Sequence, residues 1–570
     1  MRRGAFRISV IAGLSLLAGA ALSAAPDQAT VPTPAEAAGY RLYTQSEGVS
    51  SFLSVLDARA PEVSVRIVGR SLSKDEYGAR DIYLAVLANK AGPGPESLDR
   101  TKPTVLVVAA QHGNEQSAKE AVLWLLRDLA VGDLRPLLDR INVLVMPQVN
   151  PYGNFFDVRT NELGLDMNRD HVKLETEGVR AIHRVFRAWM PEVTVDVHEK
   201  GDDYYRVSIG CVSNVNISRG LQDFSRRTIL AEVEKSLRKR NITFHEYLIT
   251  EDLGVDTSSG AAYGRDPAGT REQMKRYSTT DLNDGRNSLG IYETLSFIQE
   301  GASRHDLETL KDRTTWQYHG LRAFLEAVAG RSAEVLKMVR DHRARLLDRS
   351  KAPAAGDVVH LRMRYARDPG QPELVLKRFE RALSPIRGVL KVDKKAGETL
   401  TMADIAPHGG PPTLKIVEEV VKNWFPEVEP TLSVPRPRGY LIRSDRQDLV
   451  ETLLALGVEV DIFEKGALVE AAAYHVKDIV PAALDYLAPE RIEVELAEIL
   501  RHVAQKGDFY VDGAQPAANL VPGLLEPQSE YGLIRYWKFK LAPEPGGVFP
   551  ILRITGSRAL PVVPYKRWPS

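Results

Sequence analysis

The stretch Thr104–Glu115, TVLVVAAQHGNE, joins a short apolar run to a histidine and a glutamate. Its first part, Thr104–Ala110, is rich in valine and almost wholly apolar, which is typical of a strand buried on both faces of a sheet. In an open α/β sheet, ligand sites gather at the carboxyl ends of the strands. His112 and Glu115 therefore stand where such a site would lie, and a turn over the two residues between them would let both reach one cation.

A second strand pattern delivers another histidine. Residues Val193–Val197, VTVDV, lead directly into His198. Two imidazoles and a carboxylate suit zinc, which in catalytic sites usually takes three protein ligands and leaves one position for water. His112, Glu115 and His198 thus predict one Zn²⁺ per chain. A His-Glu-x-x-His helix site is excluded, because His198-Glu199 continues as Lys-Gly-Asp.

Strand and helix patterns alternate around these two strands. Ile141–Met146 indicates a third buried strand, and Ala118–Leu129 and Glu175–Trp189 have helical spacing. Upstream, Ser64–Ser71 and Asp81–Asn89 flank a charged turn and predict a hairpin. The alternation predicts an α/β fold with a mixed, largely parallel sheet flanked by helices.

The length of the chain favours two folded parts. At 570 residues it exceeds what one hydrophobic core usually organises. The segment Lys351–Gly356, KAPAAG, marks a boundary after a long helical region. We therefore expect a catalytic domain over residues 40–350 and an accessory domain over residues 351–570. Short strand patterns such as Val358–Arg364 and Gly439–Ile442 predict that the second domain is smaller and β-rich or mixed.

Composition and charge restrict the partners. The chain is 44% hydrophobic and 26% charged, as in an ordinary globular protein. Lys plus Arg and Asp plus Glu both total 75, so no net charge draws the chain toward nucleic acid or an anionic lipid surface. The single cysteine, Cys211, forms no internal disulfide, so the fold must depend on its core and its metal. We expect no nucleic-acid partner.

Six short motifs, in the same order, resemble the zinc carboxypeptidase family that includes the pancreatic carboxypeptidases. They are His112-x-x-Glu115, Asn150-Pro151-Tyr152-Gly153, Arg159, Asp166-Met167-Asn168-Arg169, His198 and Ile291-Tyr292-Glu293-Thr294. The chain departs from the family in having Tyr152 where the family has aspartate and fewer residues between Glu115 and His198 than the pancreatic enzymes. The resemblance implies a carboxypeptidase-like fold. It also implies that metal-activated water removes the C-terminal residue from a peptide with a free C-terminal carboxylate.

The resemblance assigns substrate contacts to individual residues. Asn168 and Arg169 match the pair that binds the terminal carboxylate, a task suited to the bidentate fork of a guanidinium. Arg159 matches the arginine that polarises the scissile carbonyl and stabilises the oxyanion. The family also uses a mobile tyrosine, for which Tyr277 is the candidate and Tyr263 the alternative.

The resemblance also names a base. Glu293, in the run Leu289–Thr294 that we interpret as a strand, matches the general base, which takes a proton from the water and passes it to the leaving amine. A metal-bound imidazole usually donates its other N–H to an acceptor, and we expect a carboxylate to support His198 in this way. Asp196 is favoured over Glu199, because alternation along a strand puts Asp196 on the same face as His198.

Other functions remain open from sequence alone. N-acyl amino acid hydrolases of the aspartoacylase type also carry His-Gly-Asn-Glu, and a murein-peptide amidase is a further alternative. A carboxylate-binding pseudoenzyme is the non-enzymatic alternative, which the complete set of site residues disfavours. No P-loop or Gly-x-Ser-x-Gly motif competes with these assignments.

The first residues have the order of a secretory signal. Three arginines within the first seven residues precede an uncharged apolar run, Ile8–Leu22, and then small residues. This run falls short of the ~20 residues needed to span a bilayer. We expect residues 1–25 to be a signal peptide and residues 26–39, rich in Pro and Ala, to be an exposed tether. The mature protein should be secreted or periplasmic and free of the membrane.

Mature protein isolated from its native host should begin between Ser23 and Pro34, because signal peptidases cut after small residues. N-terminal sequencing of the purified protein measures this directly. Recovery of residues 2–20 on protein from the cytosolic fraction would contradict the assignment.

Overall fold

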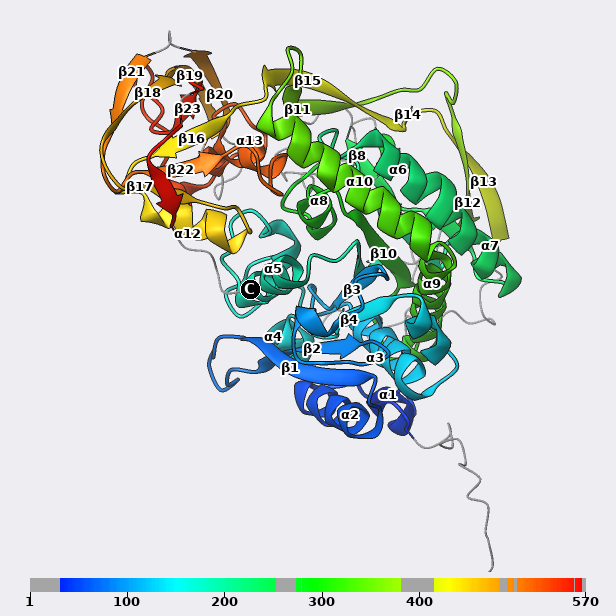
Figure 1. The fold of residues 1–570 in the computed structure, drawn as a ribbon. Coiled ribbons are helices and arrows are strands. Elements are labelled where there is room, and N and C mark those ends of the chain that lie inside the picture. The colour runs from blue at the N-terminus through cyan, green and yellow to red at the C-terminus, as the bar shows by residue number, and fades with distance from the viewer. Residues whose placement is uncertain are drawn as a thin grey trace, which may run out of the picture.

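A computed structural model describes residues 31–201, 203–252, 273–277, 279–380, 415–481, 489–496, 500–557 and 559–565. Its largest element is an eight-stranded sheet in the order β1-β2-β4-β3-β5-β10-β6-β7 (Figure 1). These strands are β1 Val63–Arg70, β2 Asp81–Leu87, β3 Thr104–Ala109, β4 Asn142–Met146, β5 Val193–Gly201, β6 Val207–Cys211, β7 Phe244–Glu246 and β10 Leu295–Ser303.

The middle of this sheet is parallel. Strands β4, β3, β5 and β10 pair in parallel, β7 runs parallel to β6, and the remaining pairs are antiparallel. Every residue of β3 and β4 is buried, as their valine-rich apolar sequences predict. The predicted mixed α/β fold is therefore confirmed, and the carboxyl ends of β3 and β5 lie side by side.

Helices flank the sheet. Those of the first part are α1 Pro34–Ala37, α2 Ser46–Arg59, α3 Gln116–Val131, α4 Pro151–Phe156, α5 Glu177–Trp189, α6 Arg219–Phe224, α7 Ala231–Lys239, α8 Gly285–Gly290, α9 Leu310–Gly330 and α10 Ser332–Lys351. Helix α3 packs against α9 and β5, and α5 packs against β1. No helix among the described residues is long and apolar enough to cross a bilayer.

The predicted tether, 26–39, is folded in its second half. Thr33 and Glu36 form a capping box at the start of α1, and Ala35 is buried. Glu36 is also paired with Arg127 of α3 at 2.6 Å. The folded part therefore starts before residue 40, which corrects the predicted boundary.

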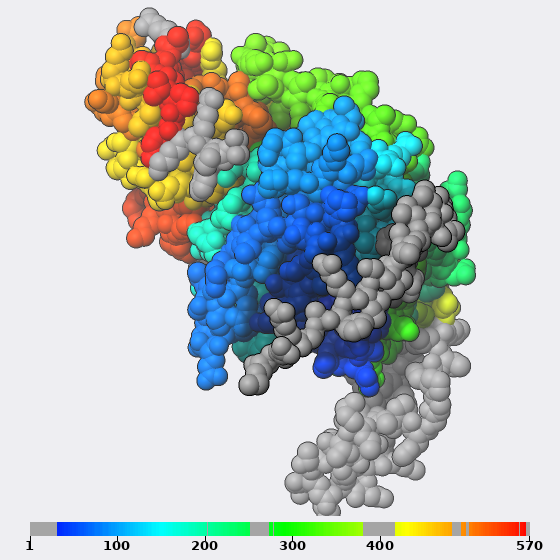
Figure 2. Space-filling view, turned by 60° about the horizontal axis from the view of Figure 1, so that its bottom comes forward, coloured from blue at the N-terminus to red at the C-terminus, as the bar shows by residue number. Residues whose placement is uncertain are grey.

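The C-terminal part is β-rich, as predicted. Its main sheet is antiparallel, in the order β21-β18-β23-β16-β22-β17-β24. In Figure 2 the yellow-to-red surface of this part gathers at one end of the molecule. Its elements are β16 Gly439–Ile442, α12 Gln447–Ala455, β17 Asp461–Phe463, β18 Ala467–Ala472, β19 Tyr474–Pro481, β20 Pro489–Leu496, β21 Leu500–Ala504, β22 Phe509–Asp512, α13 Leu520–Leu525, β23 Leu552–Ile554 and β24 Val562–Pro564.

Smaller ladders accompany the two main sheets among the described residues. They are β11-β15, β12-β13, β19-β20 and the three strands β14-β9-β8. The strands concerned are β8 Leu248–Asp252, β9 Gln273–Tyr277, β11 Val358–Ala366, β12 Leu374–Glu380, β13 Lys415–Val421, β14 Trp424–Phe425 and β15 Glu427–Pro435. Because β14 pairs with β9, strands on both sides of the predicted boundary at residue 351 share one ladder.

A buried polar junction joins the two parts. Glu293 is fully buried and accepts hydrogen bonds from the backbone N–H of Ser218 and from Asn519 Nδ2, both at 3.1 Å. Asn519 Oδ1 in turn accepts from Arg349 at 3.2 Å and from Arg436 at 3.3 Å. A buried carboxylate is tolerated only when it is paired or hydrogen-bonded, so Glu293 requires the C-terminal part to be docked.

The run Leu289–Thr294, interpreted as a strand from sequence, is not one. It begins inside α8 and continues as a turn, and β10 starts only at Leu295. Glu293 lies in that turn with a left-handed φ of 55°, a conformation that a strand cannot contain. The prediction of a strand-borne glutamate at this position is therefore wrong.

Candidate metal centre

Three predicted side chains meet at the carboxyl ends of β3 and β5. His112 follows β3, Glu115 precedes α3, and His198 lies on β5. Their ligand atoms all lie within 4.8 Å of one another, and all three residues are buried. His198 Nδ1 lies 3.0 Å from His112 Nδ1 and 2.7 Å from Glu115 Oε2, while His112 Nδ1 lies 2.8 Å from Glu115 Oε1. The predicted grouping of these residues is confirmed.

The turn that carries His112 and Glu115 is packed too tightly for a side chain. A Cβ added to Gly113 would lie 1.9 Å from the backbone carbonyl carbon of Gly153 in α4, so only glycine fits there. The Gly113 carbonyl also accepts a hydrogen bond from Asn154 Nδ2 at 2.6 Å. The close approach of Gly153 and the hydrogen bond from Asn154 thus hold the turn between His112 and Glu115 against α4.

The other ring nitrogen of each imidazole, Nε2, lies within hydrogen-bond distance of a carboxylate, to which its N–H can donate. His112 Nε2 lies 3.0 Å from Asp166 Oδ1, and His198 Nε2 lies 2.7 Å from Asp196 Oδ2. These contacts turn both Nδ1 lone pairs inward, toward each other. The predicted contact of Asp196 is confirmed, whereas Glu199 binds a buried arginine of α9 and a backbone amide of α3.

The donor set fits a zinc ion. Two inward Nδ1 atoms only 3.0 Å apart repel each other unless a cation or a proton stands between them. Burial lowers the pKa of His198, but the carboxylates of Asp196 and Glu115 outweigh it and hold that pKa well above its usual value. The surroundings therefore favour positive charge at this point, and two imidazoles with one carboxylate form a catalytic zinc set.

A second buried carboxylate adjoins the group. Strand β10 is parallel to β5 and pairs Glu300 with His198, so both side chains lie on the same face of the sheet. Glu300 is 5% exposed, and its Oε2 has no hydrogen-bond partner among the described residues. Burial, reinforced by the Glu115 carboxylate, raises the pKa of Glu300 to about 7, although His198 acts in the opposite direction.

Glu293 lies far from this group. Leu295, at the start of β10, pairs with Val193, and Glu300 is five residues further along the same strand. At ~3.3 Å per residue these five residues alone span roughly 16 Å. Glu293 precedes Leu295 and is engaged with Ser218 and Asn519. Glu293 is therefore not among the side chains gathered at His112, Glu115 and His198, whereas Glu300, which the sequence did not single out, lies beside His198.

Arg159 lies beside the metal group. Its Nε donates to Asp166 Oδ2 at 2.9 Å, and its Nη1 lies 3.5 Å from Glu115 Oε1. Its side chain is 37% exposed, so the guanidinium reaches both the group and solvent. The structure thus brings Arg159 together with the predicted metal ligands.

Asn168 and Arg169 follow shortly after Asp166, the carboxylate that contacts His112. Asn168 is buried, and its Nδ2 lies 3.4 Å from His198 Nε2. Its Oδ1 accepts a hydrogen bond from the Gly285 backbone N–H at 2.8 Å, which ties it to the start of α8. Arg169 Nη1 donates to the Asn168 carbonyl at 2.6 Å. Asn168 therefore adjoins the group of His112, Glu115 and His198, and Arg169 is bonded to Asn168.

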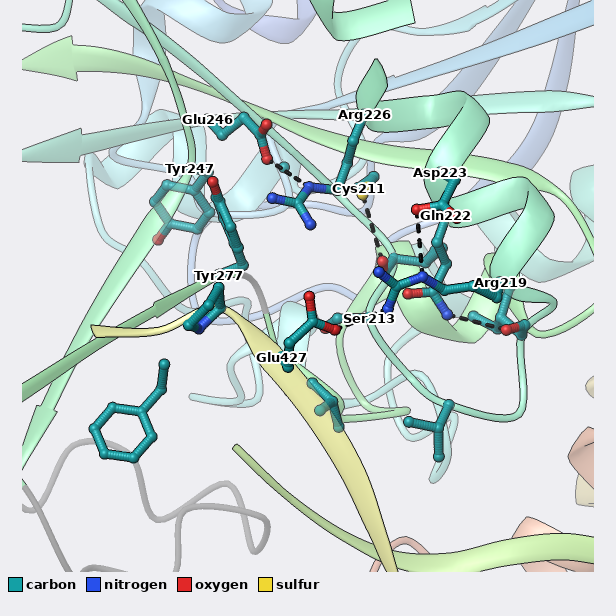
Figure 3. A pocket seen from close by; sticks show the side chains of 17 residues that line it. Cys211, Ser213, Arg219, Gln222, Asp223, Arg226, Glu246, Tyr247, Tyr277 and Glu427 are labelled. Carbon is teal, nitrogen blue, oxygen red and sulfur yellow. Dashed lines mark hydrogen bonds and ion pairs between the residues drawn. The ribbon is translucent and has the colours of Figure 1, made fainter. Parts of the chain in front are cut away.

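Tyr277 lies in a different pocket, of about 200 Å³, shown in Figure 3. The Arg226 guanidinium stands 3.9 Å from the centre of its ring, and Trp424 packs edge-on against it. Burial raises the pKa of Tyr277 to about 12. Residues of β6, α6 and β15 complete the lining, and none of the three metal-ligand candidates does so. Assistance by Tyr277 stays a prediction, and Tyr263 lies outside the described residues.

Known proteins resemble this chain over part of its length. Carboxypeptidase 2 of Trichophyton tonsurans is 27% identical over 240 residues, and that of Trichophyton equinum is 28% identical over 240. Each alignment covers 40% of this chain and 41% of the relative, so the match spans about two fifths of either protein.

Solved structures include a putative carboxypeptidase A from Shewanella denitrificans, with 21% identity and a TM-score of 0.37 over 51% of this chain and 70% of that one. A metallo-carboxypeptidase from Pseudomonas aeruginosa has 18% identity and a TM-score of 0.35 over 50% of this chain and 68% of that one. Residues 49–190 match the family described as zinc carboxypeptidase, a range that includes His112, Glu115 and Arg159. This chain is therefore similar to the zinc carboxypeptidase family over residues 49–190.

Proposed function

We propose that the protein is a zinc-dependent carboxypeptidase that removes the C-terminal residue from a peptide. The observation that carries the proposal is the buried group of His112, Glu115 and His198 with Glu300 on the adjoining strand. It combines three side chains that suit a zinc ion with a carboxylate whose Oε2 has no hydrogen-bond partner among the described residues. Such a pair of features is what metal-assisted hydrolysis requires.

We assign the metal to His112, Glu115 and His198. A bound zinc would supply a Lewis acid that polarises the scissile carbonyl and lowers the pKa of water. The two outer carboxylates, Asp166 and Asp196, hold the imidazoles in the tautomer that binds metal. The protein's own contribution is therefore a fixed and buried set of donors.

Glu300 is the proposed general base, in place of Glu293. Its free Oε2 takes a proton from the attacking water and returns it to the nitrogen of the leaving amine. The assignment rests on the register of β10 with β5, which puts this carboxylate beside His198.

The arginines are proposed to bind the substrate. Arg169 and Asn168 take the terminal carboxylate through charge-assisted hydrogen bonds. Arg159, held by Asp166 and open to solvent, stabilises the negative charge that develops on the carbonyl oxygen. Recognition of a terminal carboxylate would make the enzyme an exopeptidase.

We further propose that the protein acts outside the cytoplasm, as a secreted or periplasmic enzyme. The support is the order of basic, apolar and small residues over 1–25, which lies outside the described residues. Residues 351–570 are proposed to be an accessory domain.

Purified protein should contain about one zinc per chain, because two buried imidazoles and a buried carboxylate converge as the ligand set of a catalytic zinc. His112→Ala and His198→Ala should each lower the zinc content to below about a tenth of that level. His475→Ala, at an exposed position in the C-terminal part, is the control and should keep its zinc. Elemental analysis of dialysed protein gives the content. Full occupancy in both ligand variants would refute the assignment.

Glu300→Gln should lower kcat by about 100-fold or more, because general base catalysis typically contributes that much, and should leave KM nearly unchanged. Glu293→Gln is the matched control. It should keep kcat within about threefold, but it should lose about 1–3 kcal/mol of unfolding free energy through its buried hydrogen bonds. Steady-state kinetics and urea denaturation measure the two effects. Near wild-type turnover by zinc-loaded Glu300→Gln would mean that the base lies elsewhere.

Amidating the C-terminus of a peptide substrate should lower kcat/KM by more than about tenfold. The change removes charge-assisted hydrogen bonds to Arg169, each contributing about 1.5–3 kcal/mol. The comparison uses one blocked dipeptide in free and amidated forms. Equal rates on the two would instead favour an endopeptidase or an amidase.

A further inference from the structure

Arg286 is a buried arginine with one nitrogen that has no hydrogen-bond partner among the described residues. It is 1% exposed and lies at the start of α8. Asp284 binds its Nε at 3.0 Å and its Nη2 at 2.9 Å. Its Nη1 is buried and has no hydrogen-bond partner among the described residues. An unpaired buried donor on a charged group is costly, so such an atom points to a ligand.

The pairing of β5, β10 and β6 shows where Arg286 lies relative to His198 and Glu300. His198 and Glu300 are paired across β5 and β10, and two residues earlier Asp196 is paired with Ile298. Ile298 is also paired with Gly210 of β6. These pairs share one face of the sheet, because residues two apart on a strand point the same way. The second row lies roughly 7 Å from the first, at ~3.3 Å per residue.

Arg286 Nη1 lies over this second row. A Cβ added to Gly210 would lie 2.9 Å from Nη1 and 3.5 Å from Ile298 Cγ2, so glycine provides the room for the guanidinium. The preceding residue, Gly285, donates its N–H to Asn168. The free donor therefore stands between the residue proposed to bind the terminal carboxylate and the face that carries Glu300.

We propose that Arg286 binds the side chain of the substrate's C-terminal residue and that this residue is acidic, aspartate or glutamate. The inference rests on the proposed carboxypeptidase function and names its substrate class. A side-chain carboxylate would accept from Nη1 in a charge-assisted hydrogen bond. An apolar side chain would leave the donor unpaired, and so would a lysine ammonium, which has no acceptor.

Other acceptors make weaker partners. Asp284 already uses the other two nitrogens and neutralises the guanidinium, so what remains is a single directed donor. An amide side chain, as in glutamine, presents a neutral acceptor of the same shape. The contrast between glutamate and glutamine therefore isolates the charge on the ligand.

Blocked dipeptides that end in glutamate, glutamine, leucine and lysine test the proposal on the zinc-loaded wild-type protein. The expected result is a kcat/KM for glutamate at least tenfold above that for each of the others. Cleavage of the leucine or lysine substrate as fast as glutamate, or equal rates on glutamate and glutamine, overturns the inference and leaves the carboxypeptidase function standing.

The double variant Asp284→Asn, Arg286→Met tests whether Arg286 causes the preference for glutamate over glutamine. It removes both members of the buried ion pair and so leaves no lone charge behind, since a single change would strand its partner. The ratio of kcat/KM for glutamate to that for glutamine should fall to about 1–3. A ratio unchanged from wild type, in a variant with wild-type zinc content, overturns the role of Arg286.

Binding separates this inference from the proposed function. Calorimetry with N-acetylglutamate and N-acetylleucine should give at least tenfold tighter binding of the first, lost in the double variant. If no dipeptide is cleaved but this preference is seen, the proposed function fails and the Arg286 site stands. If neither cleavage nor preferential binding is seen, both fail.

Discussion

The parallel pairing of β5 with β10 is the constraint on which the candidate site depends. In this register His198 and Glu300 are opposite each other, and so are Asp196 and Ile298. A shift of β10 by one residue would turn Glu300 and Ile298 to the other face of the sheet. The position of the Glu300 carboxylate beside His198, a proposed metal ligand, is thus fixed by backbone hydrogen bonds between buried strands.

The polar groups on that face are left with complementary deficits. The facing Nδ1 atoms of the two histidines, 3.0 Å apart, need positive charge between them, whereas Glu300 Oε2 lacks a donor and Arg286 Nη1 lacks an acceptor among the described residues. Buried polar atoms in folded proteins are almost always satisfied, and clustered exceptions ask for an explanation. A metal, a water and an acidic substrate would together meet all three deficits, which is why we interpret the cluster as one site.

The sequence predicted the fold and the grouping of His112, Glu115 and His198, but not the position of the Glu300 carboxylate beside them. His112 and His198 each follow a run of buried apolar residues, so the local pattern alone indicates the end of a strand. Glu300 lies inside β10, and only its pairing with His198, about a hundred positions earlier, distinguishes it. Glu293 fitted a short motif, yet its environment comes from Ser218 and Asn519, which no local pattern can place. Long-range register was the missing information.

The C-terminal part is hydrogen-bonded to residues 280–283, the segment that leads into α8. Tyr531 and Thr280 share a hydrogen bond of 2.6 Å between their hydroxyls, and Asn283 donates to the hydroxyl of Tyr536. The next residue along, Asp284, holds Arg286 in place. Since Glu293, just after α8, is bonded to Asn519, both ends of this short helix are fastened to residues beyond 500. The C-terminal part therefore forms part of the support that positions the proposed substrate-binding arginine.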